Sequence, residues 1–178
     1  MFLSCTFPAD AEYRLEIQHI GERISDVLRQ RGVIGRFGVD FVSTKQGEQW
    51  DHCAIEINLR KGGTTHPFMM LQFLTDGDYD PETGLYLTPS GDPRFYYASD
   101  NVQSPLYRGL SPEDLIDISV MHQLHFHSTE QRGVVFHLIS ALSEFGKFGA
   151  VCIAESAQQA RVIYDDTVRI LNQETQNA

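Results

Sequence analysis

The sequence predicts an α+β chain, in which helices flank a mixed or antiparallel sheet. Apolar residues recur every three or four positions in some segments and alternate with polar residues in others. Groups of Gly, Pro, Asp and Ser separate these segments and indicate turns. The 178 residues are enough for one domain of ordinary size, and no internal repeat or low-complexity tract interrupts them.

The first 75 residues predict a helix, a β-hairpin and a second helix. Asp10 can cap the first helix and Gly32 can end it. The polar segment 43–49 fits the loop of the hairpin. The second helix follows a Gly/Thr loop, with Thr65 as its cap and Pro67 in its first turn. The expected bounds are 10–31 for the first helix, 33–42 and 51–60 for the strands, and about 66–75 for the second helix.

The rest of the chain predicts a turn-rich segment followed by further strands and helices. Within residues 76–110, the short runs 85–87 and 95–97 flank a turn and predict a second hairpin. Ser111 precedes Pro112 and two acidic residues, which is typical of a helix start. Beyond it we expect extended segments over 125–128, 134–139 and 150–154, a short helix over 140–145 and a closing helix over 156–171.

The composition argues against several classes of function. The 14 Lys and Arg residues against 24 Asp and Glu give a net charge of −10, which disfavours binding to nucleic acid or to an anionic membrane. No apolar run approaches the roughly 18–20 residues that span a bilayer, and the N-terminus does not resemble a secretory signal. The three cysteines form no CxxC pair, so a reducing, cytoplasmic location fits best. Cys53 and Cys152 lie in apolar runs, where we expect buried, unreactive thiols.

The predicted hairpin brings several polar side chains to one face. Side chains alternate between the two faces of a strand, and the expected register places Asp40 opposite or diagonal to Glu56 and Asn58. Arg36 and Arg60 are expected on the same face. The alternative interpretation is a solvated polar face of an edge hairpin, because such faces commonly carry ion pairs.

These residue types suit a site for magnesium and phosphate. Two neighbouring carboxylates repel each other unless a cation lies between them, and oxygen ligands are those that Mg²⁺ prefers. An arginine can bind a phosphate through two parallel hydrogen bonds. Gly62 and Gly63 allow a backbone to approach an anion closely, and the helix start beside them offers free N–H groups.

The hairpin resembles the C-terminal signature of the ATP-grasp superfamily. The matching segments are Gly35-Arg36-Phe37-Gly38-Val39-Asp40-Phe41-Val42 and Ala54-Ile55-Glu56-Ile57-Asn58-Leu59-Arg60. The resemblance implies that Asp40, Glu56 and Asn58 hold two Mg²⁺ ions, which Mn²⁺ can replace, against the phosphates of ATP. It implies that Glu56 bridges both ions and that Arg60 stabilises the transferring phosphoryl group.

The loop after the hairpin belongs to the same resemblance. Lys61, Gly62, Gly63 and Thr64 are expected to contact the nucleotide phosphate or the substrate carboxylate. A solvated lysine is an equal alternative for Lys61. The loop therefore completes the set of residues that we expect to bind ATP.

Further segments resemble the branch of this superfamily that contains the pheganomycin-type peptide ligase. Lys61–Pro67 resembles that branch, and Gly133–His137 and Phe145–Gly149 resemble its appended C-terminal domain. The resemblance covers about residues 10–170. It implies the C-terminal lobe of an ATP-grasp fold, with an antiparallel sheet and flanking helices, plus a small α/β extension. The expected division is 1–75 for the ATP-grasp part, 76–110 for a turn-rich hairpin insertion and 111–178 for the appended domain.

The resemblance implies the C-terminal half of an ATP-dependent carboxylate–amine ligase. In such an enzyme a carboxylate attacks the γ-phosphate of ATP to give an acyl phosphate, and an amine then displaces phosphate to form an amide. The lobe that grips the nucleotide lies upstream of the signature in this family, so we expect the chain to need that lobe in cis or in trans and to be inactive alone. The alternative is a non-enzymatic module that binds Mg-nucleotide weakly or mediates assembly. An exposed lobe face would also favour a homo-oligomer.

The histidines allow a third hypothesis. His122, His125 and His127 form an HxxHxH cluster, with His137 nearby in sequence, and imidazoles favour zinc. Half-buried, hydrogen-bonded histidines are the alternative interpretation. His66, beside the Gly loop, is a candidate functional residue or a helix-start residue that bonds locally.

Overall fold

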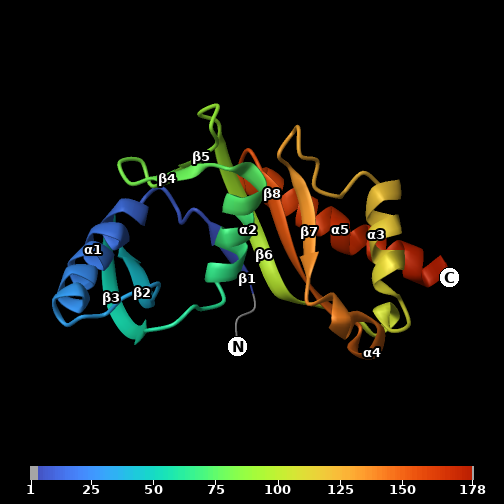
Figure 1. Ribbon diagram of the computed structural model, residues 1–178, viewed down its shortest axis with the longest axis horizontal. Helices are drawn as coiled ribbons and strands as arrows, with labels where there is room; N and C mark the ends of the chain where they lie inside the picture. The colour runs from blue at the N-terminus through green and yellow to red at the C-terminus, as the bar shows by residue number, and fades with distance from the viewer. Residues whose placement is uncertain (1–3, 178) are drawn as a thin grey trace.

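A six-stranded sheet forms the centre of the molecule, and a two-stranded hairpin lies apart from it at one end of the longest axis (Figure 1). The structure is a computed structural model that describes residues 4–177. The large sheet has the order β4-β5-β6-β8-β7, with β1 also paired to β6, and all these pairs are antiparallel. Its strands are β1 (Ser4–Phe7), β4 (Asp78–Asp80), β5 (Leu85–Leu87), β6 (Pro93–Gln103), β7 (Gly133–His137) and β8 (Lys147–Ala154). The prediction of an α+β chain with an antiparallel sheet is confirmed.

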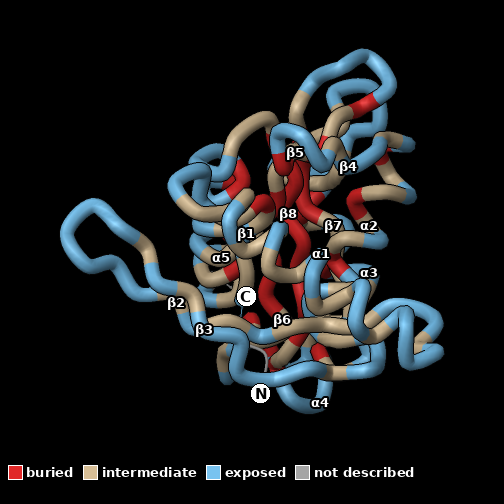
Figure 2. Tube along the Cα trace, turned by 90° about the vertical axis from the view of Figure 1, so that its left-hand side faces the viewer, coloured by how far each residue is buried: buried red, intermediate tan, exposed pale blue. Residues whose placement is uncertain are grey.

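Apolar clusters cover both faces of the large sheet, with β8 as the shared centre. On β8, Ala150 and Cys152 belong to the cluster that includes α5, whereas Val151 and Ile153 belong to the cluster that includes α2. Every residue of β8 after Lys147 is buried, and Figure 2 shows this buried line through β6 and β8. The helices are α1 (Arg14–Gln30), α2 (Thr65–Thr75), α3 (Pro112–Met121), α4 (Leu142–Phe145) and α5 (Ala157–Asn177), with 3-10 turns at Pro105–Tyr107 and Ile139–Ala141.

The hairpin of β2 (Gly38–Gln46) and β3 (Gln49–Asn58) packs against α1 instead of joining the large sheet. We call residues 12–58 the hairpin unit, which includes Glu12 and Tyr13 just before α1. The contact between its parts is partly aromatic, because Trp50 lies 4.6 Å from the ring of Tyr13. It is also polar, because Glu12, just before α1, accepts hydrogen bonds from Trp50 Nε1 and from the Lys45 ammonium. α1 has no buried residue, so this unit has no closed core of its own.

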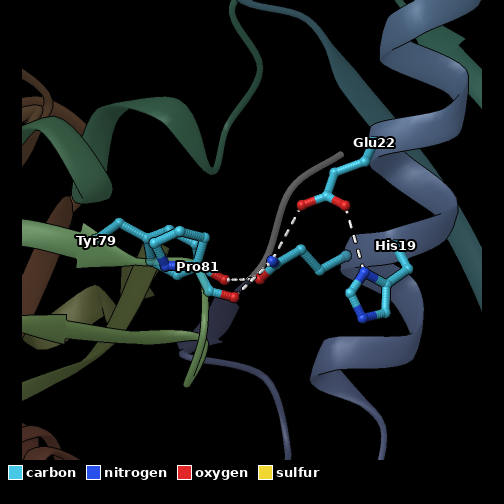
Figure 3. A network of polar contacts seen from close by, with 5 residues as sticks. His19, Glu22, Tyr79 and Pro81 are labelled. Carbon is cyan, nitrogen blue, oxygen red and sulfur yellow. Dashed lines mark hydrogen bonds and ion pairs between the residues drawn. The ribbon is translucent and has the colours of Figure 1, made fainter.

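Polar contacts attach α1 to the turn between β4 and β5. Gln18 donates to the carbonyl of Pro81 at 2.8 Å and accepts from the Tyr79 hydroxyl at 2.5 Å. Figure 3 shows this network, which Glu22 and His19 extend along the helix. Arg14 adds a bond from Nε to the carbonyl of Thr83 at 3.0 Å. The hairpin unit is therefore held to the sheet mainly by hydrogen bonds rather than by apolar burial.

The hairpin strands are longer toward the turn than the sequence predicted. The expected loop over 43–49 is wrong, because strand pairing continues to Gln46 and Gln49 and leaves only Gly47 and Glu48 as the turn. Gly47 has φ +65°, which a tight two-residue turn requires and glycine adopts readily. Polar side chains are compatible with a strand here because Thr44, Lys45 and Gln46 are exposed and Ser43 bonds His52 across the hairpin. The first strand also begins at Gly38, later than the expected residue 33.

Two local predictions on the helices differ in outcome. Ser111 caps α3 as expected, and a capping box with Asp114 satisfies two backbone N–H groups. The cap of α2 was assigned to Thr65, but the structure has Thr64 at that position without a side-chain cap bond. The Thr65 hydroxyl instead accepts a bond from the Gly62 N–H at 3.1 Å.

The prediction of a buried cysteine is confirmed for Cys152 but not for Cys53. Cys152 is buried, and desolvation raises the pKa of its thiol. The expectation of a buried Cys53 is wrong, because its strand lies on an open hairpin and the residue is exposed. An apolar run identifies a strand, but it does not show that both faces of the strand are covered.

Strands from all three expected segments meet in one sheet. β1 precedes the hairpin unit, β4 to β6 come from 76–110, and β7 and β8 come from the C-terminal segment. The division into an ATP-grasp part, an insertion and an appended domain stays a prediction. Within residues 4–177, no helix is long and apolar enough to cross a membrane.

Candidate functional site

The hairpin places the three candidate metal ligands close together. Asp40 lies opposite Glu56 in the register, and Gly38 lies opposite Asn58. Asn58 Nδ2 donates to Asp40 Oδ2 at 3.3 Å. The expected cross-strand relationship between these residues is therefore confirmed.

A β-bulge lies directly beside this pair. The register shifts between Asp40 and Phe41, so that Phe41 faces Ala54 and Ile55 is the extra residue on β3. A bulge bends a strand and increases its twist, and bulges commonly redirect side chains next to functional sites. Here the bulge lies immediately next to the opposed carboxylates of Asp40 and Glu56.

The donor chemistry at this end of the hairpin fits a hard divalent cation. Asp40 and Glu56 are exposed carboxylates. Since the Asn58 amide nitrogen faces Asp40, its oxygen is left to act as a ligand. Three oxygen ligands of this kind match the preference of Mg²⁺, which keeps several waters and binds one or two carboxylates together with phosphates. The residues present therefore fit the group that the sequence implied.

The loop after β3 is folded onto itself. Arg60 is exposed, and its guanidinium donates to the carbonyl of Lys61 at 3.3 Å. The Gly62 N–H is bonded to the Thr65 hydroxyl, so it is not free in this conformation. Lys61, Gly63 and Thr64 are exposed at the start of α2. The loop thus leaves a lysine, an arginine and a helix N-terminus accessible to an anion.

Arg36 does not join the carboxylates as the strand alternation predicted. Its guanidinium donates to Gln72 Oε1 at 3.2 Å and lies 5.7 Å from the centre of the Phe68 ring, both on α2. The reason is that β2 starts only at Gly38, so Arg36 precedes the strand and is free of its alternation. Residues 35–37 and the start of α2 line a shallow, open hollow of about 390 Å³ that includes Arg36 and Thr64.

His66 contacts a residue that is distant in sequence. Its ring centre lies 4.4 Å from that of His137 at the end of β7, and His137 Nε2 lies 3.6 Å from Asp100 Oδ1 on β6. Burial lowers the pKa of His137, His66 lowers it further, and Asp100 opposes both. A Cβ on Gly149 would lie 2.1 Å from the His137 ring, so this glycine makes the space for the ring.

Sequence reasoning did not identify Asp100 or a second buried histidine, His52. The side chain of His52 is 3% exposed, and its Nδ1 forms a hydrogen bond with Ser43 Oγ at 2.7 Å. Its Nε2 lies 3.3 Å from Glu16 Oε2, but the two are not aligned for a hydrogen bond. The hairpin register predicts the pairing of Ser43 with His52, because both lie the same distance from the turn. No spacing in the sequence reveals the contact of His137 with Asp100, since it joins two strands far apart in the chain.

The HxxHxH histidines do not form a metal centre. Among residues 4–177, no three His, Cys, Asp or Glu side chains gather closely enough to hold a metal ion. His122 instead bonds Glu174 on α5 at 2.8 Å. Isolated bridges pair His125 with Val134 on β7 and His127 with Arg132 just before β7. The third hypothesis, a histidine-based metal-binding protein, is therefore not supported.

Comparison with known proteins gives two matches. Residues 114–167 match the family model described as the PGM1 C-terminal domain. The chain is also 30% identical over 159 residues to the L-propargylglycine--L-glutamate ligase of Streptantibioticus cattleyicolor, covering 89% of this chain and 32% of that protein. The chain thus spans about a third of the length of the curated relative that it matches. Together the two matches confirm the resemblance to a peptide ligase with an appended C-terminal domain.

Proposed function

Because the chain is similar to a peptide ligase over most of its length, we propose that it is the C-terminal part of an ATP-dependent carboxylate–amine ligase of the ATP-grasp superfamily. The observation that carries this proposal is the hairpin register, which sets Asp40 opposite Glu56 with Asn58 bonded to Asp40. The relative's name states that it joins two amino acids. We therefore propose amino acids as the carboxylate and amine substrates.

The hairpin would hold two Mg²⁺ ions, or Mn²⁺ in their place. Glu56 would bridge the ions, with Asp40 on one and Asn58 on the other. Bound Mg²⁺ supplies positive charge against the phosphate oxygens of ATP. The exposed carboxylates keep this site open to a nucleotide from the solvent side.

Arg60 and the adjacent loop would act on the phosphates directly. The Arg60 guanidinium would exchange its single bond to the Lys61 carbonyl for paired bonds to the transferring phosphoryl group. Lys61, Gly62, Gly63 and Thr64 would surround the phosphate or the substrate carboxylate at the start of α2. Such preorganised positive groups are the main source of rate enhancement in phosphoryl transfer.

The overall chemistry would proceed in two balanced steps. The substrate carboxylate oxygen attacks the γ-phosphorus of ATP, and the bond to ADP breaks. The amine nitrogen then attacks the acyl carbon of the resulting acyl phosphate, loses a proton, and inorganic phosphate leaves as the amide forms. Each step needs charge stabilisation at the same phosphoryl group, which is why one compact cationic site can serve both.

The proposal includes a further lobe, supplied in cis or in trans, without which the chain is inactive. The exposed apolar side chains of the hairpin unit support this, because Ile55 is 62% and Ile57 46% exposed on β3. Large apolar side chains gathered on an open face are typical of surfaces that another polypeptide covers. The reducing cytoplasm is the proposed location, which the free cysteines Cys5, Cys53 and Cys152 favour.

Calorimetric titration of the chain with ATP, with and without Mg²⁺, tests the hairpin site. We expect binding that requires Mg²⁺ and that is lost in Glu56→Ala and Asn58→Ala. Glu48→Ala is the matched control, because Glu48 is an exposed carboxylate at the turn of the same hairpin and should leave binding unchanged.

Two results of this titration would contradict a nucleotide site on the hairpin. A folded chain that releases no heat, or that binds ATP equally well in the Glu56→Ala variant, would show that this hairpin holds no nucleotide by itself. The ligase function would then belong to the ancestor of the chain or to a complete protein that includes the further lobe, and not to this chain by itself.

A further inference from the structure

A cavity of about 770 Å³ lies between the loop 122–133 and the first turns of α5. It is at the end of the molecule that holds α3 and α5, away from the hairpin unit (Figure 1). All of its lining residues fall within the segment that matches the PGM1 C-terminal domain. Leu124, Val162 and Ile163 form an apolar part, and polar side chains line the rest.

The loop that forms one wall is fixed by backbone contacts. The buried Arg94 on β6 donates to the carbonyls of Glu130 at 3.3 Å and Gln131 at 3.2 Å. Gly133 has φ +125°, and a Cβ there would lie 2.4 Å from the carbonyl oxygen of His125. The loop therefore needs glycine at this position to fold back on itself, and the wall is formed before any ligand binds.

Two opposite charges on this wall have no partner. No hydrogen bond or ion pair joins the side chain of Arg132 or Glu130 to another residue in the described part of the chain. The other charged groups of the cavity differ, because Asp166 is bonded to Arg169 at 2.7 Å and His122 to Glu174. One guanidinium and one carboxylate thus remain available to a ligand.

A buried nitrogen of the same wall is also unsatisfied. His125 Nδ1 is inaccessible to solvent and has no hydrogen-bond partner. Buried polar atoms without a hydrogen-bond partner are rare in folded proteins, because folding removes their hydrogen bonds to water and nothing replaces them. The first turn of α5, with Gln158 at the cavity, adds the positive end of a helix dipole.

From these features we propose that the cavity binds an α-amino acid with an apolar side chain, as its zwitterion. The carboxylate lies against Arg132, the ammonium group against Glu130, and the side chain against Leu124, Val162 and Ile163. The proposal does not rest on the ligase function, because none of these residues belongs to the hairpin site.

Three related ligands test the proposal on the intact chain. L-leucine carries both charges, 4-methylpentanoate lacks only the ammonium group, and 3-methylbutylamine lacks only the carboxylate. Binding is followed by NMR through the ring signals of the seven histidines. We expect L-leucine to shift the signals of His125 and His127 in a saturable way and to leave His19 on α1 unchanged. Each of the other ligands should bind at least about tenfold more weakly, as expected for one lost charge-assisted contact.

Substitutions of Arg132 and Glu130 test which residue contacts the carboxylate and which contacts the ammonium group of the ligand. Arg132→Gln should weaken L-leucine at least about tenfold, whereas Arg23→Gln, on exposed α1, should have no effect. Glu130→Gln should weaken L-leucine but leave 4-methylpentanoate unaffected. Equal affinity for the three ligands, an unchanged affinity in Arg132→Gln, or the absence of any shift at His125 and His127 would each overturn the proposal.

Discussion

Asp40 lies directly opposite Glu56 across the hairpin, and within residues 4–177 neither carboxylate forms an ion pair with a basic side chain. Like charges at directly opposed positions destabilise a β-ladder. Asn58 offsets part of this through its bond to Asp40, but it carries no positive charge. We therefore expect a bound cation to stabilise the hairpin by offsetting this repulsion.

Asp40→Asn should stabilise the metal-free chain and remove its response to Mg²⁺. Removing one of two opposed charges is worth about 0.2–1 kcal/mol in the free energy of unfolding. We expect this gain in urea unfolding with a chelator present, and we expect added Mg²⁺ to stabilise the wild type but not the variant. Glu48→Gln is the control for a general charge effect. An equal Mg²⁺ response in wild type and Asp40→Asn would contradict a cation site between these strands.

Gly149→Ala should destabilise the chain, although it changes only one methyl group. The new Cβ would lie 2.1 Å from the His137 ring, so the ring must move out of its buried position beside His66. Overpacking of this kind costs about 1–3 kcal/mol. Gly21→Ala in α1 is the matched control with the opposite sign, since nothing lies within 4 Å of its Cβ and alanine favours a helix by up to about 1 kcal/mol. Urea unfolding of both variants checks the prediction, and a Gly149→Ala chain as stable as the wild type would refute it.

The lowered pKa of His137 predicts a loss of stability in mild acid. Burial and His66 keep the ring neutral in the folded chain, against the opposing effect of Asp100. The unfolded chain therefore binds more protons at His137 as the pH falls below its ordinary pKa of about 6.5. The contribution of neutral His137 to the free energy of unfolding is fully present above that pH. It decreases as the pH falls toward the lower pKa of the folded state.

A comparison with His137→Asn isolates this contribution. The histidines that do not contact His137 are common to both proteins, so their effects cancel in the difference. We expect the free energy of unfolding to fall more in the wild type than in the variant between about pH 7.5 and about pH 5.5. Parallel pH profiles would show that His137 is not held neutral by its surroundings.

The local patterns predicted the elements well, because each depends on neighbouring residues. The capping box at Ser111, the end of α4 at Gly146 and the register of Asp40 with Glu56 all follow from short-range spacing. The position of Cys53 did not follow, since an apolar strand can be buried or open depending on what covers it. Exposure is a property of the whole molecule.

The residues that the sequence did not bring together are joined through the sheet. Asp100 reaches His137 because β6 and β7 both pair with β8, and His66 reaches it because α2 packs on that sheet. The predicted position of Arg36 was wrong because the alternation of side chains along β2 was applied to a residue that precedes the strand. Arg36 instead bonds Gln72 on α2. Long-range topology and strand ends were therefore the limits of the prediction.

The hairpin unit should open before the large sheet unfolds. No residue of α1 is buried, whereas every residue of β8 after Lys147 is. Local opening is easiest where few apolar contacts are lost, so amides of α1, β2 and β3 should exchange with deuterium at least about tenfold faster than those of β6 and β8. Hydrogen exchange by mass spectrometry measures this, and Trp50, the single tryptophan, reports the same opening by fluorescence. Equal protection of both parts would mean that the polar contacts of Gln18 and Arg14 suffice to couple them. The hairpin unit would then be stable without a further lobe, which would remove one of the supports for that lobe.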